Sequence, residues 1–544
     1  MRFFWKFCLI ELLFTFKAKI QWPGGNANPL ISKKMLFPLD TLKKLQEERS
    51  ATSFGQLTPV KIQLLRKALK YDRLKGWALK NRLEFLDDGV THSLGWYNGA
   101  VERTSSTSRL INVLVRSLQG QNIGVVVMGG SNSAGGGLDI DKEDFRGLYY
   151  RVFARWWQET VQPITGSKII LHNLSVGGTS SNFFAFCYRT LLNSSTTMDI
   201  ALLDFTVNDF LQFKDSKFPM ALPLEQLTRE ILLIEKVSSP SLIYVNFVQG
   251  ISKTPFCNNL ENNGQTALAN NYGITSVSLR KFLCLRNTDF KQGFTEMFAS
   301  DGVHASIFAH WKIAVMLINY TRKTMLEVLH RLNQRPRSKI LVNPLLPLQN
   351  ASPLSSTCTH NFFSNLQKAV FPRNRAVKFH DKPFCFTHIT PDGTENGTFH
   401  QTLKVEQVRK VGFYLMPKHF INQTPQKSRT DAFGGWKSLS SNSWLKLDIF
   451  IPKVTEKCIP KLNESSLRNV AIATRTDSNG ATASIWLDNN ENKAISINTH
   501  SSFGHTRLNT IARNVTPGHH LLSVRTETPG TFILSGVMTG PSYN

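Results

Sequence analysis

The chain has 544 residues, of which 41% are hydrophobic and 10% aromatic, a composition typical of globular proteins and unlike that of disordered or fibrous chains. A chain of this length is too long to fold around a single hydrophobic core of ordinary size, so we expect at least two domains. The formal net charge of +26 favours anionic partners such as acidic polysaccharides or membranes. No nucleic-acid partner is expected, because the basic residues do not form a recognisable nucleic-acid-binding module. A solvated basic surface without a specific partner is an equally good interpretation.

The N-terminal segment, residues 1–22, has Arg2 ahead of an apolar run that Lys6 and Glu11 interrupt. This pattern favours a signal peptide or a signal anchor over a buried helix, and it predicts entry into the secretory pathway, with secretion or N-terminal membrane attachment. No internal stretch is apolar for the length of a membrane span.

Acceptor sequences for N-glycosylation also favour the secretory route, since Asn-x-Ser/Thr is modified at exposed sites in extracytoplasmic compartments. They occur at Asn173, Asn193, Asn319, Asn350, Asn396, Asn422, Asn463 and Asn514. Because Asn173 lies inside an apolar strand pattern, we expect it to be unmodified.

Six cysteines follow the N-terminal segment, and none has Cys-x-x-Cys spacing. They are Cys187, Cys257, Cys284, Cys358, Cys385 and Cys458. An even set in a secreted protein favours up to three disulfides over a metal site. The sequence does not determine the connectivity; the short-loop pairings would be Cys257 with Cys284 and Cys358 with Cys385. Six free thiols in a cytosolic protein are the alternative.

Residues 23–118 carry Leu-, Lys- and Arg-rich segments whose apolar residues recur every three to four positions, which predicts a helical N-terminal lead-in. Residues 119–332 then alternate short apolar runs with helical patterns. The expected strands are 123–130, 168–176, 199–207, 241–248 and 274–279, and a long helix over 307–332 closes the region. Strands this apolar are expected to be buried on both faces, and their alternation with helices predicts a three-layer α/β/α domain with a parallel sheet.

A linker is predicted over 333–360, where Pro, Ser and Asn are frequent. Residues 361–544 contain short strand patterns separated by turn residues, which predicts an all-β sandwich domain. Carbohydrate binding is a candidate role for it, because Trp436, Trp444 and Trp486 are able to stack on sugar rings, although tryptophans in a sandwich more often belong to the core.

Ser131 follows the first predicted strand in the sequence Gly129-Gly130-Ser131. Glycines allow a tight turn from strand to helix and leave the serine hydroxyl accessible as a nucleophile. A phosphate-binding loop is disfavoured, because neither a P-loop ending nor a dinucleotide fingerprint is present. The structural alternative is that Ser131 is an ordinary helix N-cap.

The ends of the following strands carry further candidate residues. Gly178 follows the second strand and is able to offer an unencumbered backbone N–H, and Asn208 follows the third and is able to add a side-chain amide donor to a developing oxyanion. Asp301 and His304 are three residues apart, so one helical turn would place both on the same face, where Asp301 would orient the imidazole. His304 would then take the proton from Ser131. Loops at the carboxyl ends of parallel strands meet at one site, so we expect these residues to converge.

The region from about 120 to 330 resembles the SGNH hydrolases, the GDSL-like esterase superfamily. The candidate residues occur in the same order as the Ser, Gly, Asn and His of the four sequence blocks of that family. The first block reads Gly-Gly-Ser where the name-giving motif has Gly-Asp-Ser, and Thr206 stands where the third block usually has Gly. The resemblance implies a flavodoxin-like α/β/α fold and a catalytic triad of Ser131, His304 and Asp301. It also implies an oxyanion hole formed by Ser131, Gly178 and Asn208, and no metal or organic cofactor.

Three functions are consistent with this pattern. The first is a serine esterase that removes an acyl group, preferably acetyl, from a glycan or another acylated small molecule. The second is a glycan O-acyltransferase that uses the same serine, and the third is a non-catalytic, secreted glycan-binding protein on a hydrolase scaffold. A complete triad argues against the third.

Overall fold

The computed structural model describes most of the two predicted domains. The described residues are 57–81, 94–102, 107–138, 147–192, 196–233, 239–248, 261, 264–284, 296–334, 367–371, 383–391, 400–416, 434–453 and 467–540. The N-terminal segment, most of the predicted linker, and Cys257, Cys358 and Cys458 lie outside them. Within the described ranges, no helix combines the length and the apolarity that a bilayer crossing requires.

The first domain is built around a six-stranded sheet in the order β1-β6-β5-β4-β2-β3. Its strands are β1 Val101–Glu102, β2 Ile123–Gly129, β3 Ile169–Asn173, β4 Ile200–Asp204, β5 Ser241–Asn246 and β6 Thr275–Ser278. Strands β2 to β6 are parallel and follow the flavodoxin-like order, which confirms the predicted fold class. The two-residue β1, which pairs antiparallel with β6, was not predicted.

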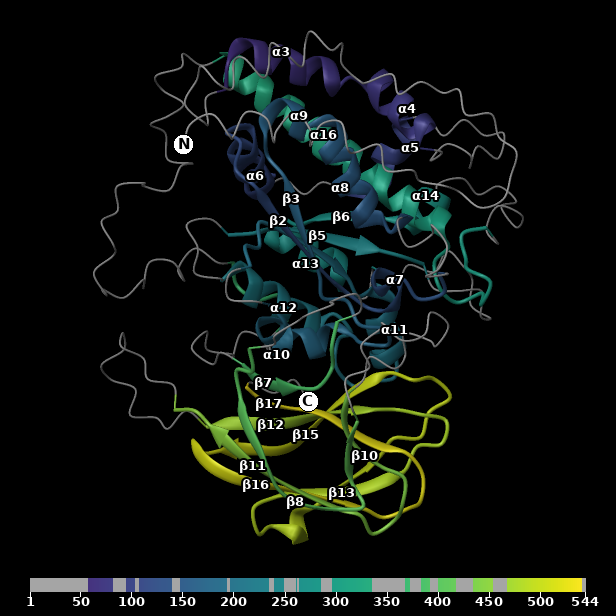
Figure 1. Ribbon diagram of the computed structural model, residues 1–544, viewed down its shortest axis with the longest axis vertical. Coiled ribbons are helices and arrows are strands. Elements are labelled where there is room, and N and C mark those ends of the chain that lie inside the picture. Colours follow the sequence, from purple (N-terminus) through teal and green to yellow (C-terminus); the bar gives the residue numbers. More distant parts are fainter. Residues whose placement is uncertain are drawn as a thin grey trace, which may run out of the picture.

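Helices cover both faces of this sheet (Figure 1). They are α3 Pro59–Ala68, α4 Tyr71–Lys80, α5 Leu94–Gly99, α6 Ser108–Leu118, α7 Ser131–Ala134, α8 Tyr149–Thr160, α9 Gln162–Thr165, α10 Ser181–Leu191, α11 Thr206–Phe213, α12 Leu222–Leu232, α13 Gln265–Tyr272, α14 Leu279–Cys284 and α16 Ile307–Gln334. Along β2, Val125 and Val127 pack in the core with α6, α8 and α16, while Val126 and Met128 pack in the core with α10, α12 and α13. Strand β2 is therefore buried on both faces, as its apolar run predicts.

Two details of the strand prediction are wrong. Strand β3 is only partly buried, with Ile170 43% exposed, because it lies at the sheet edge. The run 199–207 does not continue as a strand beyond Asp204: Thr206 and Val207 begin helix α11 instead. Their β-branched side chains suit a strand locally, but the tertiary context overrides that preference.

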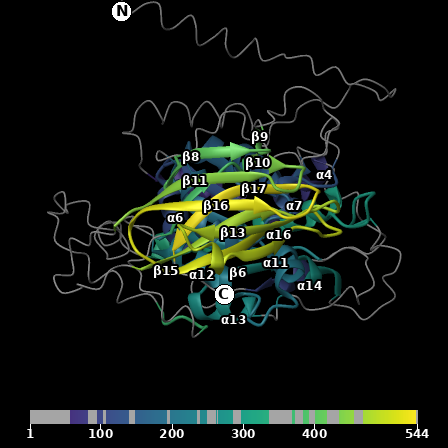
Figure 2. The same cartoon turned by 90° about the horizontal axis from the view of Figure 1, so that it is seen from below.

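The second domain is a β-sandwich, as predicted. Figure 2 shows it from the side away from the α/β domain. One sheet has the order β15-β12-β17-β10-β9 with β7 also paired to β17, and the other has the order β14-β13-β16-β11-β8. The strands are β7 Phe384–Thr387, β8 Lys404–Val411, β9 Tyr414–Met416, β10 Gly435–Ser438, β11 Trp444–Ile451, β12 Arg468–Arg475, β13 Thr482–Leu487, β14 Ile495–Asn498, β15 Thr506–Val515, β16 Gly518–Thr526 and β17 Phe532–Gly540. Alternate residues of both sheets form one core between them.

The three sandwich tryptophans are not free platforms for sugar rings. Trp436 and Trp486 are only 4% and 5% exposed. Trp444 is half-buried and meets Trp486 edge to face, and the Arg525 guanidinium lies over both rings. Trp436 belongs to the sandwich core, whereas Trp444 and Trp486 lie on the outer face of their sheet, where they pack against each other and Arg525.

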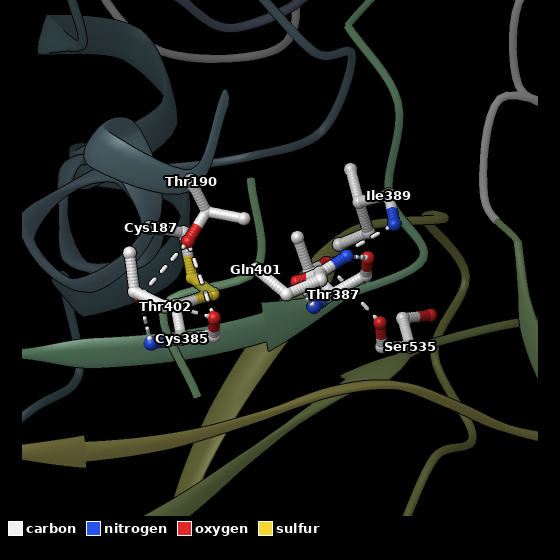
Figure 3. The surroundings of a disulfide bond; sticks show 8 residues. All are labelled: Cys187, Thr190, Cys385, Thr387, Ile389, Gln401, Thr402 and Ser535. Carbon is white, nitrogen blue, oxygen red and sulfur yellow. Dashed lines mark hydrogen bonds between the residues drawn. A yellow bond between two sulfur atoms is a disulfide. The ribbon is translucent and has the colours of Figure 1, made fainter. Parts of the chain in front are cut away.

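Helix α10 lies between the parallel sheet and the sandwich (Figure 1). Its apolar face shares a core with Cys385, Ala473 and Met538 of the sandwich. A disulfide joins Cys187 of α10 to Cys385 of β7, and Thr190 Oγ1 donates to the Cys385 carbonyl at 3.1 Å beside it (Figure 3). The two domains are therefore joined both covalently and by a common core.

This disulfide overturns the expected pairing of Cys358 with Cys385. The expected pairing was based on the short loop between Cys358 and Cys385. The fold instead packs α10 against β7, and the two bonded cysteines are 198 residues apart in the sequence. Cys284 is also disulfide-bonded. The pairing expected for it, with Cys257, falls outside the described residues.

One predicted glycosylation acceptor is buried. Asn319 lies within α16, is 1% exposed, donates its amide to Asn98 and accepts from Arg322. A glycan cannot be accommodated there in the folded protein, because modification requires an exposed side chain. Asn514, by contrast, is exposed at the end of β15.

Candidate active site

Ser131 lies where β2 gives way to a single helical turn. The strand ends at Gly129 and Gly130 occupies the N-cap position of α7. Gly135, in the left-handed region, is the C-cap of this helix. Since Gly130 is the cap, Ser131 is the first helical residue, and its interpretation as an ordinary N-cap is wrong. A side chain at position 130 would overlap the Asn208 amide, so this glycine allows the two loops to meet.

Asp301 and His304 are in contact, as predicted. The His304 Nδ1 lies 2.6 Å from Asp301 Oδ2. The other carboxylate oxygen of Asp301 accepts the backbone N–H groups of Val303 and His304 at 2.9 and 3.0 Å. The two residues lie in a turn and not on a helix, so the predicted contact is right but its predicted basis is wrong.

The electrostatics of this pair favour an ionised carboxylate. Partial burial would raise the pKa of Asp301, but the hydrogen bonds from the His304 ring and from the two backbone N–H groups outweigh it and lower the pKa below its ordinary value. The carboxylate therefore holds the imidazole with Nδ1 protonated and leaves Nε2 as the free acceptor.

The imidazole of His304 and the side chain of Ser131 both lie next to Gly136. A methyl group at Gly136 would be 3.0 Å from His304 Nε2 and 3.1 Å from Ser131 Cβ. Nε2 and Ser131 Cβ are therefore no more than 6.1 Å apart. The structure thus brings Ser131, His304 and Asp301 together from segments about 170 residues apart.

The loop that carries Gly178, and Asn208, border the serine loop. A methyl at Gly177, the neighbour of Gly178, would lie 3.7 Å from Ser131 Cβ, and Gly178 itself has a φ of +63°. Asn208 lies in the first turn of α11, with its amide against Gly130. All five predicted site residues therefore surround the carboxyl ends of β2, β3 and β4.

Two further residues hold these loops together and were not predicted as site residues. Asn132 is 4% exposed, and its side-chain oxygen accepts the N–H of Ala305 at 2.9 Å, which fixes the histidine turn against the serine loop. Asp209 accepts both the N–H and the hydroxyl of Ser181 at 2.8 Å, which ties the Asn208 helix to the end of the Gly178 loop. Asn132 follows Ser131 directly, but no sequence pattern indicates its long-range acceptor role.

A buried acid lies behind the serine loop. Asp204 ends β4, is 2% exposed, and accepts the N–H and the hydroxyl of Ser133 at 3.2 and 2.7 Å. Burial raises the pKa of Asp204 to about 7, although the Ser133 hydrogen bonds act in the opposite direction. The folded state therefore holds a proton on this carboxyl at pH values where the unfolded chain has released it.

This raised pKa makes stability depend on pH. Between about pH 4 and pH 7 the folded state binds more protons than the unfolded state, so the free energy of unfolding falls as pH rises, by up to about 1.4 kcal/mol per unit for one such group. In Asp204→Asn this contribution disappears. We expect urea denaturation at pH 5, 6 and 7 to show that the free energy of unfolding falls less steeply with pH in the variant than in the wild type. An equal pH dependence in the two proteins would contradict the raised pKa of Asp204.

No known family model matches the chain, and no curated protein is significantly similar to it. Similar solved structures include a two-domain esterase (CEX) active on acetylated mannans, at 17% identity and a TM-score of 0.49, covering 82% of this chain and 99% of that one. TesA is similar at 16% identity and a TM-score of 0.26, over 38% of this chain and 99% of that one. A carbohydrate-binding module from the Cellvibrio mixtus lichenase 5A is similar at 11% and 0.17, over 25% and 92%.

Proposed function

We propose that the protein is a serine esterase that hydrolyses an acyl ester, preferably an acetyl ester, carried on a glycan. The observation that carries this proposal is the convergence of Ser131 with the hydrogen-bonded pair His304–Asp301 beside Gly178 and Asn208. Nucleophile, base, orienting acid and oxyanion donors are the complete set that acyl transfer requires.

In the proposed first step, His304 Nε2 takes the proton of Ser131 as Oγ attacks the ester carbonyl carbon. The negative charge that develops on the carbonyl oxygen is stabilised by the backbone N–H groups of Ser131 and Gly178 and by the Asn208 amide. Collapse of the tetrahedral intermediate breaks the ester bond, and the leaving alcohol takes the proton from His304. Water then attacks the acyl-serine by the same route, releasing the carboxylic acid and restoring Ser131.

Three features favour a glycan as the carrier of the acyl group. The net charge of +26 attracts acidic polymers, and the sandwich lies directly against the Gly178 loop, so that a polymeric alcohol at the site would lie close to both domains. Passage through the secretory pathway, which the N-terminal segment and the acceptor sequences favour, would bring the protein to extracellular glycans.

The test of this proposal is a substrate panel run on the full chain. Acetate release is measured from acetylated polysaccharides, and product release from p-nitrophenyl acetate, butyrate and octanoate. We expect acetyl esters to be hydrolysed fastest and acetylated polysaccharide to be a substrate. Adding an unacetylated glycan as acceptor separates hydrolysis from transfer, because acyl groups appearing on the acceptor in place of free acid would support the acyltransferase instead. Absence of activity on every ester would contradict the proposal.

Asn208 provides a graded test of the oxyanion assignment. Asn208→Ala removes one side-chain donor, and loss of one such donor typically lowers the rate by about 100- to 1000-fold. Because the oxyanion forms only in the transition state, the effect is expected in kcat with little change in KM. Steady-state kinetics on p-nitrophenyl acetate measure it, and Asn208→Asp, which replaces the donor by an acceptor, should be no more active than Asn208→Ala.

A further inference from the structure

The loop 177–180, which carries Gly178, is bounded by both domains. On the sandwich side, the Gly178 carbonyl accepts the N–H of Thr506 at 2.8 Å. The hydroxyls of Thr179 and Thr506 lie 3.1 Å apart, and both side chains are almost completely buried. These hydrogen bonds link residues that are separated by more than 300 positions in the sequence.

The two glycines of this loop face opposite directions. A methyl at Gly177 would contact Ser131, whereas a methyl at Gly178 would lie 2.6 Å from the Gly504 carbonyl oxygen and 2.7 Å from Arg475 Nη1. The sandwich therefore lies against Gly178 without room for even one more carbon atom. The loop cannot move away from Ser131 on that side unless the sandwich moves with it.

The sandwich segment that makes these contacts is itself fixed. Thr506 is the first residue of β15, an edge strand. Just before it, His505 donates its N–H to Thr476 Oγ1 at 2.9 Å and accepts the Thr476 N–H at 2.9 Å. Helix α10 begins at Ser181 directly after the loop, and in its middle the Cys187–Cys385 disulfide joins it to the sandwich. The sandwich therefore holds this region at two points.

We propose that the sandwich domain is a working part of the active site, and that Thr506 is a positioning residue that holds the Gly178 loop in the geometry needed for the oxyanion hole. This inference rests on the esterase function proposed above and adds a role for the second domain that does not require it to bind substrate. Donors aimed at the oxyanion must be held in place before the reaction, and a displacement of about 1 Å can lower a rate about 100-fold.

The proposal predicts an effect on small esters that have no sugar. If the sandwich only binds glycan, substitutions in it should leave kcat for p-nitrophenyl acetate unchanged. A domain that positions the loop changes kcat for that ester and leaves KM nearly constant, because the lost interaction acts in the transition state.

Three substitutions at Thr506 separate the contacts. Thr506→Pro removes the N–H donor, and proline is tolerated at the first residue of an edge strand. Thr506→Val keeps the N–H and removes the hydroxyl, and Thr506→Ser keeps both. The control is Thr526→Val in β16, which belongs to the other sheet. This substitution removes a buried hydroxyl that donates to the Ser440 carbonyl and accepts the Ser443 N–H, and both partners lie outside the loop.

We expect kcat for p-nitrophenyl acetate to fall about 10- to 100-fold in Thr506→Pro and about 3- to 10-fold in Thr506→Val, with KM within about threefold of wild type. Thr506→Ser and Thr526→Val should both retain the wild-type rate. Amide hydrogen exchange in residues 177–181 should be faster in Thr506→Pro and Thr506→Val only.

Two results would overturn the inference: unchanged kcat and exchange in folded Thr506→Val, or an equal fall in kcat for Thr526→Val. If Thr506→Pro does not fold, the comparison between valine and serine at this position still decides the question. Hydrogen exchange reports the loop independently of activity. An inactive wild type whose loop exchange nevertheless responds to Thr506→Val would therefore count against the esterase proposal and not against the contact between the sandwich and the loop.

Discussion

Ser131→Ala is expected to lower kcat/KM for every ester substrate by roughly 10,000-fold or more, because it removes the proposed nucleophile while the oxyanion donors and the substrate contacts remain. The fold should be unaffected, since Ser131 is only half-buried and begins a single helical turn. Steady-state hydrolysis of p-nitrophenyl acetate measures the effect, with thermal denaturation as the check on folding.

The matched control for this variant is Ser117→Ala. Ser117 is fully buried and donates its hydroxyl to the Leu114 carbonyl within α6, away from the site. We expect its rate to remain within about twofold of wild type. Esterase activity that survives in Ser131→Ala would remove the proposed mechanism, whatever the substrate.

His304→Ala is expected to have an effect of similar size, since nucleophile and base act as one unit and the loss of either is almost as damaging as the loss of both. The double variant Ser131→Ala/His304→Ala should therefore be no less active than either single variant. Added imidazole should restore part of the rate to His304→Ala and none to Ser131→Ala, because only the first retains a nucleophile.

The control for His304→Ala is the same substitution at an exposed histidine outside the candidate site. His330 lies on the outer part of α16, and His330→Ala should keep the wild-type rate. Rate losses that add up in the double variant, instead of coinciding, would show that Ser131 and His304 do not act on the same step.

The core of the fold was predictable because its signal is local. Strands β2, β4 and β5 are runs of Val, Ile and Leu bounded by helical patterns, and burial on both faces of a parallel sheet requires such runs. The errors occurred where the local preference and the tertiary context differ. Thr206 and Val207 suit a strand but begin a helix, and the two residues of β1 are too few to form a pattern.

The candidate site was predictable for a topological reason. Residues that follow successive parallel strands meet at one edge of the sheet, so Ser131, Gly178 and Asn208 were expected together from their order alone. Contacts that depend on long-range packing left no local signal. The acceptor role of Asn132, the disulfide between Cys187 and Cys385, and the hydrogen bond from Thr506 to Gly178 each join segments more than 170 residues apart.

The most direct measurement of the central claim is the rate at which a fluorophosphonate probe labels the folded protein, with the modified residue identified by mass spectrometry. If His304 activates Ser131 beside an oxyanion site, the adduct will be found on Ser131, and labelling will be slowed at least about 100-fold in His304→Ala. Labelling of Ser131 at the same rate in wild type and His304→Ala, or an adduct on another residue, would contradict the account.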